Sequence, residues 1–507
     1  MGWLAVTRSH TLQPRISILP FPSAPNREPP VERSKNLSEE SFAQPGALRI
    51  TGLASGGEGV GRMEDGRVVF VEGGVPGDLV ELAEWTTRKK VARARIGRLV
   101  EASPERVEPR CAHFGRCGGC QWQHIGYAAQ LSAKQTMVRN ALERIGGFSL
   151  GRDVRPGSDP AVTLGSDSPD EPDRELVVQI KGSPDPYGYR GRARIVESKG
   201  GFGYRVRGSR EIERIETCPV LTDAAQDALA KLIQDQTADK AHQGKAEKSE
   251  SPPGRKPPRA TEWILSAGTS GPAIAERVRG KRDAPGASAF VTIEVLGEKL
   301  RASSSSFMQG NALLWDSLAD EVCRQSLAEA DKGSASSSSA GSPALPRRFV
   351  ELYAGIGFLT LPLARRGLVG VAIESDRSAL SDLTFNLERA GLAKEVEVVR
   401  GRVESRRDLA RRLAKADLLV VDPPRVGLEA GVREIIAAQG PSRIVYVSCD
   451  PATLARDLRA LASGGYRLST VCALDLFAQT PHVEVVARLD RSPSEEEDPG
   501  CAVGSGQ

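Results

Sequence analysis

The sequence predicts an α/β protein of three parts: a small OB-like β-barrel, a central α+β domain and a C-terminal doubly wound, Rossmann-like domain. Residues 47–107 hold short strand candidates separated by glycine-rich turns, a pattern typical of small barrels. Residues 108–330 mix helical and strand patterns around a group of cysteines. Residues 347–490 alternate apolar strands with helices, which predicts a parallel sheet with helices on both faces.

Length and composition restrict the class of protein. A chain of 507 residues should hold several domains. A net charge of +4, with 26% charged residues, does not by itself indicate a nucleic-acid partner. No apolar segment is long enough to cross a membrane, and no secretory signal core opens the chain. We expect a cytoplasmic monomer that does not associate with membranes, whose eight cysteines serve metal binding or catalysis rather than disulfides.

Polar, low-complexity segments interrupt these parts. They lack the periodicity of helices or strands and are rich in Pro, Ser, Gly or charged residues. We expect a disordered leader at 1–46, polar insertions at 148–176 and 236–261, a Ser-rich linker at 331–346 and a disordered tail at 491–507.

The expected barrel carries a run of basic residues. Its strand candidates lie at 48–53, 67–71, 78–82 and 92–100, and Asp65-Gly66 is a hairpin signal. The basic residues are Arg88, Lys89, Lys90, Arg93, Arg95 and Arg98. They suit contacts to an RNA backbone, but a solvated strand protected from edge pairing by charge would have the same pattern.

Four cysteines form a candidate metal centre. Cys111, Cys117 and Cys120 lie within ten residues, and Cys218 follows about a hundred residues later, before a proline. The two glycines between Cys117 and Cys120 allow the backbone to fold tightly around a metal. A close triplet with a distant Cys-Pro favours an iron–sulfur cluster, whereas zinc sites more often use two close pairs. Zinc remains an alternative.

Further along the central domain, residues 127–147 have the pattern of an amphipathic helix that ends at two glycines. Residues 187–195 and 201–207 show strand-like alternation, with arginine and tyrosine interleaved. This mixture can supply phosphate contacts and stacking faces for RNA, although a hairpin with ordinary exposed arginines would look the same.

The C-terminal domain begins with a glycine turn between a strand and a helix. Gly355 and Gly357 follow the first strand, and Glu374 ends the second, about 20 residues on. A carboxylate at that place can accept hydrogen bonds from a ribose diol. Since the full dinucleotide fingerprint is missing, an adenosine cofactor without a pyrophosphate, such as S-adenosylmethionine, fits best. A fold with another nucleotide, or none, remains open.

Two further motifs leave strands at the same edge. Cys449 lies between a buried strand and a helix that Asp450 should cap, so the helix dipole is expected to favour the reactive thiolate. A small buried cysteine would have the same context. Asp422 opens the rigid sequence Asp-Pro-Pro-Arg425, where it could bind substrate or cofactor, or simply cap a helix.

Together these motifs resemble the S-adenosylmethionine-dependent RNA uracil-C5 methyltransferases, across about residues 47–490. The resemblance is greatest to the bacterial branch that modifies 23S ribosomal RNA and carries a TRAM barrel and a [4Fe–4S] cluster. The motifs that carry it are Cys111, Cys117 and Cys120 with Cys218, Phe307-Met308-Gln309-Gly310-Asn311, Leu352-Tyr353-Ala354-Gly355-Ile356-Gly357, Asp422-Pro423-Pro424-Arg425, Ser448-Cys449-Asp450-Pro451 and Gln479-Thr480-Pro481-His482-Val483-Glu484.

The resemblance implies covalent catalysis on an RNA base. It assigns Cys449 as the nucleophile that adds to C6 of uracil and Glu484 as the base that removes the C5 proton. Glu484 lies in an apolar strand, where a carboxylate is otherwise costly, although it could face solvent on an edge strand. The implied cofactor-binding residues are Gln309, Tyr353, Gly355, Glu374 and Asp422, and the implied cluster ligands are Cys111, Cys117, Cys120 and Cys218.

One departure from the family concerns the adenine. Members often place an Asn after the third strand, whereas this chain has Arg400-Gly401-Arg402-Val403-Glu404, so no adenine contact is assigned.

Two alternative functions are retained. One is methylation of the tRNA T-loop, and the other is an inactive RNA-binding or assembly factor. We expect the cluster to be structural or to shape RNA, because methyl transfer needs no electron.

Overall fold

The structure is a computed structural model that describes residues 46–88, 90–151, 176–198, 200–243, 261–278, 289–328 and 345–491. All of these residues belong to one compact unit. Nearly all of the predicted leader, linker and tail, and most of both predicted insertions, lie outside the described residues. None of the helices described combines the length and apolar character needed to cross a lipid bilayer.

The N-terminal part is a closed barrel with the strand order β1-β2-β3-β5-β4. The strands are β1 (Leu48–Leu53), β2 (Gly59–Arg62), β3 (Val68–Glu72), β4 (Leu79–Arg88) and β5 (Val91–Glu101). Alternate side chains such as Ile50, Val69 and Val71 fill its interior. The turn between β2 and β3 contains Gly66 at φ 85°, which confirms the predicted hairpin.

Half of the basic run on the barrel is paired with carboxylates. Arg93 pairs with Glu58 at 2.9 Å and Arg95 pairs with Glu72 at 3.2 Å, both on the barrel surface. Arg98 pairs with Glu81. These carboxylates offset the positive charge of three of the six basic residues, so the barrel does not present the continuous cationic stripe that the linear sequence suggested. Lys89 lies outside the described residues.

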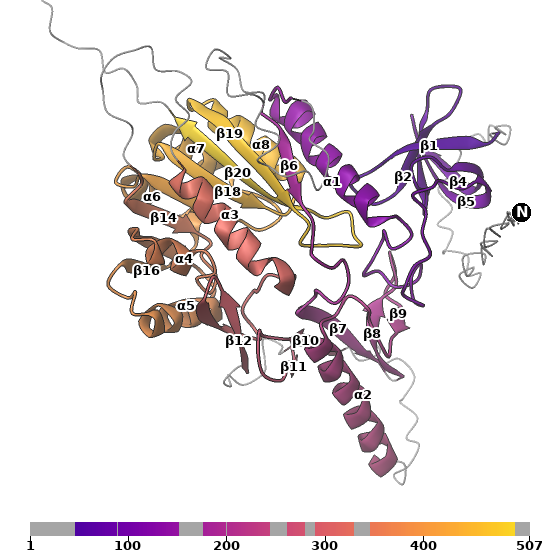
Figure 1. The fold of residues 1–507 in the computed structure, drawn as a ribbon, viewed down its shortest axis with the longest axis horizontal. Helices are drawn as coiled ribbons and strands as arrows, with labels where there is room; N and C mark the ends of the chain where they lie inside the picture. Colours follow the sequence, from indigo (N-terminus) through magenta and orange to yellow (C-terminus); the bar gives the residue numbers. More distant parts are fainter. Residues whose placement is uncertain are drawn as a thin grey trace, which may run out of the picture. The chain divides into compact units, whose positions relative to one another are not determined.

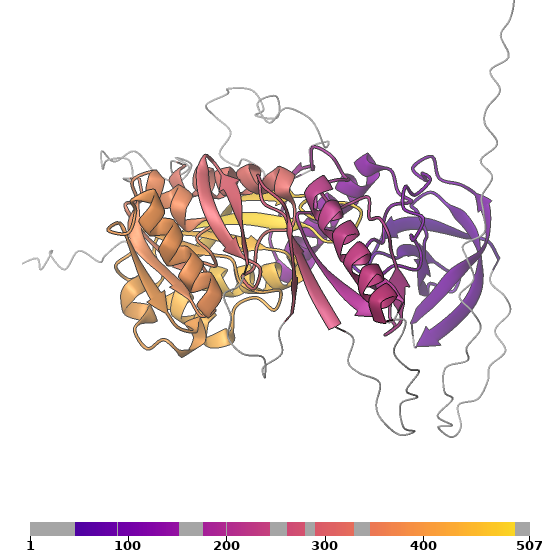
Figure 2. The same cartoon turned by 90° about the horizontal axis from the view of Figure 1, so that it is seen from below.

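The central part contains a five-stranded sheet of order β11-β10-β7-β8-β9. Its strands are β7 (Arg192–Ser198), β8 (Gly201–Arg205), β9 (Ile212–Arg214), β10 (Thr261–Ser266) and β11 (Ile274–Arg277). Helix α2 (Asp223–Gln243) packs on this sheet through Leu229 and Leu232 (Figures 1 and 2).

Two boundary predictions in this part were wrong. The insertion expected from residue 236 begins inside α2, because good helix formers continue the helix to Gln243. The strand expected at 187–195 begins only at Arg192, because Arg190 forms isolated bridges to Asn311 and Leu221 instead of a continuous ladder.

The C-terminal part is an eight-stranded sheet of order β16-β15-β14-β17-β18-β20-β19-β6 (Figure 1). Its strands are β14 (Arg348–Leu352), β15 (Val369–Glu374), β16 (Val396–Arg400), β17 (Leu418–Val421), β18 (Arg443–Ser448), β19 (Tyr466–Leu474), β20 (Glu484–Arg491) and β6 (Val178–Lys181). The first five strands are parallel, as predicted, while β20 is antiparallel to both of its neighbours. The edge strand β6 comes from the segment assigned to the central domain. The predicted boundary between the central and C-terminal domains therefore does not separate two sheets.

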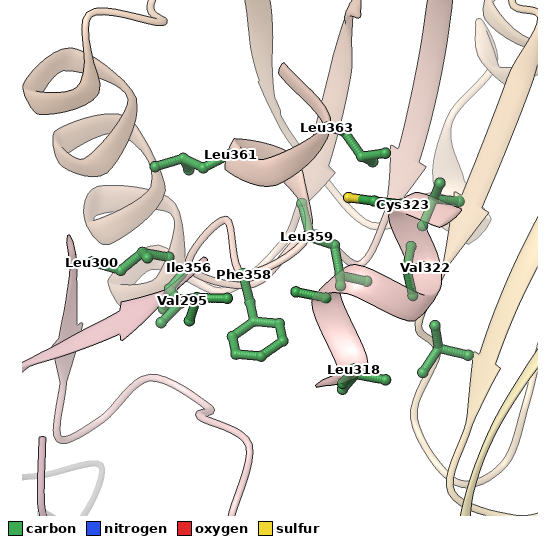
Figure 3. Close-up of a cluster of buried hydrophobic side chains, with 14 of the residues drawn as sticks. Val295, Leu300, Leu318, Val322, Cys323, Ile356, Phe358, Leu359, Leu361 and Leu363 are labelled. Atoms are coloured by element: carbon green, nitrogen blue, oxygen red, sulfur yellow. The ribbon is translucent and has the colours of Figure 1, made fainter. Parts of the chain in front are cut away.

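Helices cover both faces of this sheet. One core packs α3 (Trp315–Leu327), α4 (Thr360–Arg365) and α5 (Arg377–Ala390) against it, together with the hairpin of β12 (Phe290–Val295) and β13 (Glu298–Ser303) (Figure 3). The other core contains α1 (Tyr127–Ala141), α6 (Leu409–Leu413), α7 (Ala430–Gln439) and α8 (Pro451–Ala462). Successive strand residues alternate between the two cores, which explains why the strands are apolar throughout.

Candidate active site

A cavity of about 620 Å³ opens at the carboxyl edge of the parallel strands. Ligands bind at this edge in open α/β sheets. Seven residues predicted from the sequence to act in catalysis or cofactor binding line this cavity. They are Gln309, Tyr353, Gly355, Glu374, Asp422, Cys449 and Glu484.

The turn after β14 and the end of β15 form one side of the cavity. Glu374 accepts hydrogen bonds from the backbone N–H groups of Gly355, Ser375 and Asp376 at 2.9, 2.6 and 2.7 Å. A carboxylate oxygen has about two acceptor positions. Oε2 of Glu374 takes only the Gly355 bond, because the bonds from Ser375 and Asp376 go to Oε1, so Oε2 keeps capacity for a ligand hydroxyl. Gly355 has φ 57°, a conformation that glycine adopts at little cost.

Tyr353 also occupies the left-handed region, at φ 64°, which is uncommon for a residue with a side chain. Its hydroxyl donates a hydrogen bond of 2.9 Å to Glu404. Glu404 lies in the segment 400–404, for which the sequence analysis assigned no adenine contact. Glu404 therefore restrains the Tyr353 ring at the cavity wall.

Cys449 follows β18 and precedes α8. The Asp450 carboxylate caps α8 by accepting hydrogen bonds from the N–H groups of Ala452 and Thr453 at 3.0 and 2.9 Å, as predicted. The expected thiolate is not favoured, however. Burial and the nearby Glu484 raise the pKa of Cys449 to about 11, although a hydrogen bond from Arg425 opposes this rise.

Two acidic side chains, the buried Glu484 and the partly buried Asp422, line the same cavity. Glu484 begins β20, which lies between β18 and β19, so the alternative of a solvent-facing edge residue is wrong. Burial and the charge of Asp422 raise the pKa of Glu484, and burial raises that of Asp422. Gln309 donates a hydrogen bond of 3.4 Å to Asp422. The alternative that Asp422 caps a helix is not seen among the described helices, since the next helix, α7, begins after Glu429.

The four predicted metal ligands line a second, smaller cavity. Cys111, Cys117, Cys120 and Cys218 surround it, together with Tyr204 and Arg190. Burial raises the pKa of Cys117 to about 12 and that of Cys120 to about 11. Among the described residues, no group of three or more His, Cys, Asp or Glu side chains is arranged to hold a metal ion.

The sequence did not single out several other residues of the larger cavity. Arg190 and Arg192 line it, and Arg190 also lines the cysteine cavity. Both lie in the arginine- and tyrosine-rich stretch 187–195, which the sequence indicated for RNA contacts but not for this cavity. Glu351 lines it from β14, where burial raises its pKa to about 8 and Thr360 donates a hydrogen bond of 2.6 Å. A lone acid in an apolar strand was the available clue.

Comparison with known proteins adds family information. Residues 344–492 match the family model of tRNA (uracil-5-)-methyltransferases, and residues 47–96 match the TRAM domain. An uncharacterized RNA methyltransferase of Gloeobacter violaceus is 34% identical, over 91% of this chain and 99% of that protein. The 23S rRNA (uracil(1939)-C(5))-methyltransferase RlmD of Azoarcus sp. is 32% identical, over 87% of this chain and 99% of that protein.

A solved structure supports the fold. The tRNA (uracil-54, C5)-methyltransferase of Pyrococcus abyssi, in complex with S-adenosyl-L-homocysteine, aligns with a TM-score of 0.60. The alignment covers 87% of this chain and 100% of that chain, at 23% sequence identity.

Proposed function

This chain belongs to the RNA uracil-C5 methyltransferase family, and we propose that it methylates a uridine of 23S ribosomal RNA through a covalent adduct on Cys449. One observation carries the proposal: Cys449, the carboxyl groups of Asp422 and Glu484 and an adenosine-type turn line the same cavity. The relative from Azoarcus named for uracil 1939 of 23S rRNA supports the choice of RNA.

S-adenosylmethionine would supply the methyl group as an electrophile. Glu374 keeps acceptor capacity for ribose hydroxyls, and Gly355 allows close approach of the backbone. Gln309 orients the Asp422 carboxyl group, which can then bind a polar group of the donor or the uracil. These residues position the donor beside Cys449.

The Cys449 sulfur would attack C6 of uracil as its proton passes to solvent, while the C5–C6 π electrons move to O4 as an enolate. The guanidinium of Arg425 stabilises the thiolate against its raised pKa. C5 of the enolate would then take the methyl group, while the electrons of the donor's S–CH3 bond stay on sulfur and S-adenosylhomocysteine leaves. Glu484 would next remove the C5 proton. The electrons of the C5–H bond restore the C5=C6 bond, and the C6–S bond breaks to release the thiolate.

RNA that contains 5-fluorouridine tests this chemistry. Fluorine at C5 cannot be removed as a proton, so the wild-type protein with S-adenosylmethionine should form an adduct that survives denaturing electrophoresis. Cys449→Ala should form none. A wild type that forms no adduct would falsify the covalent mechanism. Methyl transfer to 23S rRNA fragments and to tRNA transcripts, measured in parallel, separates the two RNA classes.

We further propose that the four cysteines hold a [4Fe–4S] cluster. Each thiolate of such a cluster bonds a different iron, which suits four thiols around a cavity. A single zinc ion would need all four sulfurs about 2.3 Å from one point. Arg190 also lines this cavity, and no carboxylate among the described residues is within ion-pair distance of it. An anionic cluster would provide the missing counter-charge.

Iron analysis tests the cluster. Protein purified without oxygen should carry about four irons per chain, and Cys218→Ala should lose most of them. Less than about one iron in the wild type, or stoichiometric zinc in its place, would contradict the assignment.

A further inference from the structure

The loop between β19 and β20, residues 475–483, contacts both the larger cavity and the segment that carries Cys120. Phe477 of this loop lines the larger cavity, and the loop ends at Glu484. Its middle residue, Gln479, is buried and has φ 66°, a conformation that a non-glycine residue keeps only when its surroundings hold it.

Three polar groups of Gln479, its N–H, its carbonyl oxygen and its side-chain oxygen, have partners outside the loop. Its carbonyl oxygen accepts hydrogen bonds from the N–H groups of Gln121 and Trp122, each at 3.0 Å. Its own N–H donates to the side-chain oxygen of Gln130 at 3.1 Å, and its side-chain oxygen accepts from the Gln130 amide at 3.0 Å. Gln121 directly follows Cys120 in the chain.

Gln130 is itself held in one orientation. Its side-chain amide also donates to the carbonyl oxygens of Trp122 and Ile125 at 3.0 and 2.9 Å. These bonds fix which end of the amide faces Gln479, and the residue is fully buried near the start of α1. Figure 1 shows the yellow loop after β19 reaching this end of α1.

Two more contacts hold the loop at the two residues before Gln479. The Tyr189 hydroxyl donates to the carbonyl oxygen of Ala478 at 2.8 Å. Lys134, one helical turn after Gln130, donates to the carbonyl oxygen of Phe477 at 3.1 Å. The loop before Glu484 is thus shaped by α1 and the cysteine segment, far away in sequence, and not by its own residues alone.

We propose that Gln130 is a positioning residue for the Glu484 carboxylate, acting with the N–H groups of Gln121 and Trp122 through Gln479. This inference rests on the proposed role of Glu484 as the base. Its consequence is specific to one step. Displacing Glu484 slows transfer of the C5 proton to its carboxylate, and with it the cleavage of the C6–S bond. Addition of Cys449 and transfer of the methyl group precede that step.

Gln130→Met tests the proposal, because methionine fills similar space without the amide. Adduct formation with 5-fluorouridine RNA should stay within about three-fold of wild type, whereas turnover on ordinary RNA should fall at least about ten-fold, as expected for a misplaced catalytic group. A denaturation-resistant adduct should accumulate on ordinary RNA in the presence of S-adenosylmethionine. KM for the RNA should change little.

Gln135→Met is the matched control. Gln135 is also buried on α1, but its amide donates to Val178 of β6 at 2.6 Å and not to the loop. It should lose stability without accumulating adduct. Gln479→Gly is a second variant, which removes only the side-chain pairing and relaxes the positive φ. It should also keep adduct formation and lose turnover, but the loss of turnover should be smaller than in Gln130→Met.

The outcomes are distinct. If Gln130→Met lowers adduct formation and turnover equally, or changes neither, the positioning role is wrong. If Gln135→Met accumulates adduct as well, the effect reflects general loss of packing and the proposal fails. A wild type that forms no adduct overturns the proposed function itself, a result separate from either of these.

Discussion

Cys449 is subject to opposing influences within a few ångströms. Burial and Glu484 favour the neutral thiol, while Arg425 favours the thiolate. The sequence predicted only the position of this cysteine at a helix N-terminus. The buried acid beside it comes from β20, which is a neighbour of β18 in the sheet and not in the chain.

The raised pKa of Cys449 predicts slow alkylation of the free protein. With a pKa of about 11, only about one thiol in a thousand is ionised at pH 8. The rate of iodoacetamide labelling at Cys449, followed by peptide mass spectrometry, should therefore rise steadily to about pH 11. Arg425→Leu should react more slowly at each pH, because the thiolate loses its cation. A plateau near pH 8 would show that the site favours the thiolate.

At the scale of elements, local sequence signals located most strands and the cap of α8. Asp450 and Asp376 cap α8 and α5 through side-chain hydrogen bonds, an arrangement worth about 1 kcal/mol each. The five parallel strands were predictable because β-branched, apolar runs ended at turn residues. Neither the antiparallel placement of β20 nor the recruitment of β6 has a local signal, since both depend on pairing between distant segments.

The loop from residue 423 to 428 also combines features that have a local sequence signal with a feature that depends on a distant segment. Asp457 of α8 is fully buried and accepts hydrogen bonds from the Leu428 N–H at 2.8 Å and the Tyr446 hydroxyl at 2.7 Å. A side chain at Gly427 would approach Asp457 to 2.4 Å, so only glycine fits there. The two prolines of the loop were evident in the sequence, whereas this anchor on another helix was not.

At the scale of the whole molecule, the predicted domain boundaries do not separate independent cores. Helix α1, upstream of the first insertion, packs in the same core as α8 and the C-terminal sheet. A buried ion pair between Lys134 of α1 and Asp475 reinforces this union, and neither side chain is exposed.

Breaking that ion pair should destabilise the protein strongly. Lys134→Met leaves the Asp475 carboxylate buried without its cation and should lower the free energy of unfolding by about 3–5 kcal/mol in urea titrations. The double variant Lys134→Met/Asp475→Leu should recover most of this loss. Ser132→Ala, exposed on the same helix, is the control. A single variant within about 1 kcal/mol of wild type would mean that the pair does not join the two segments.

The amino-acid sequence alone was enough to predict the barrel, the parallel strands, the family and the residues around the larger cavity, because turn signals, periodicity and short motifs are local. The tertiary structure decided three other features: the carboxylate pairing of half of the basic run, the neutral thiol of Cys449 and the attachment of the Glu484 loop to the cysteine segment. Each depends on which distant charges and amides lie a few ångströms apart. Electrostatic and hydrogen-bond energies fall steeply with that distance, and the order of residues along the chain does not set it.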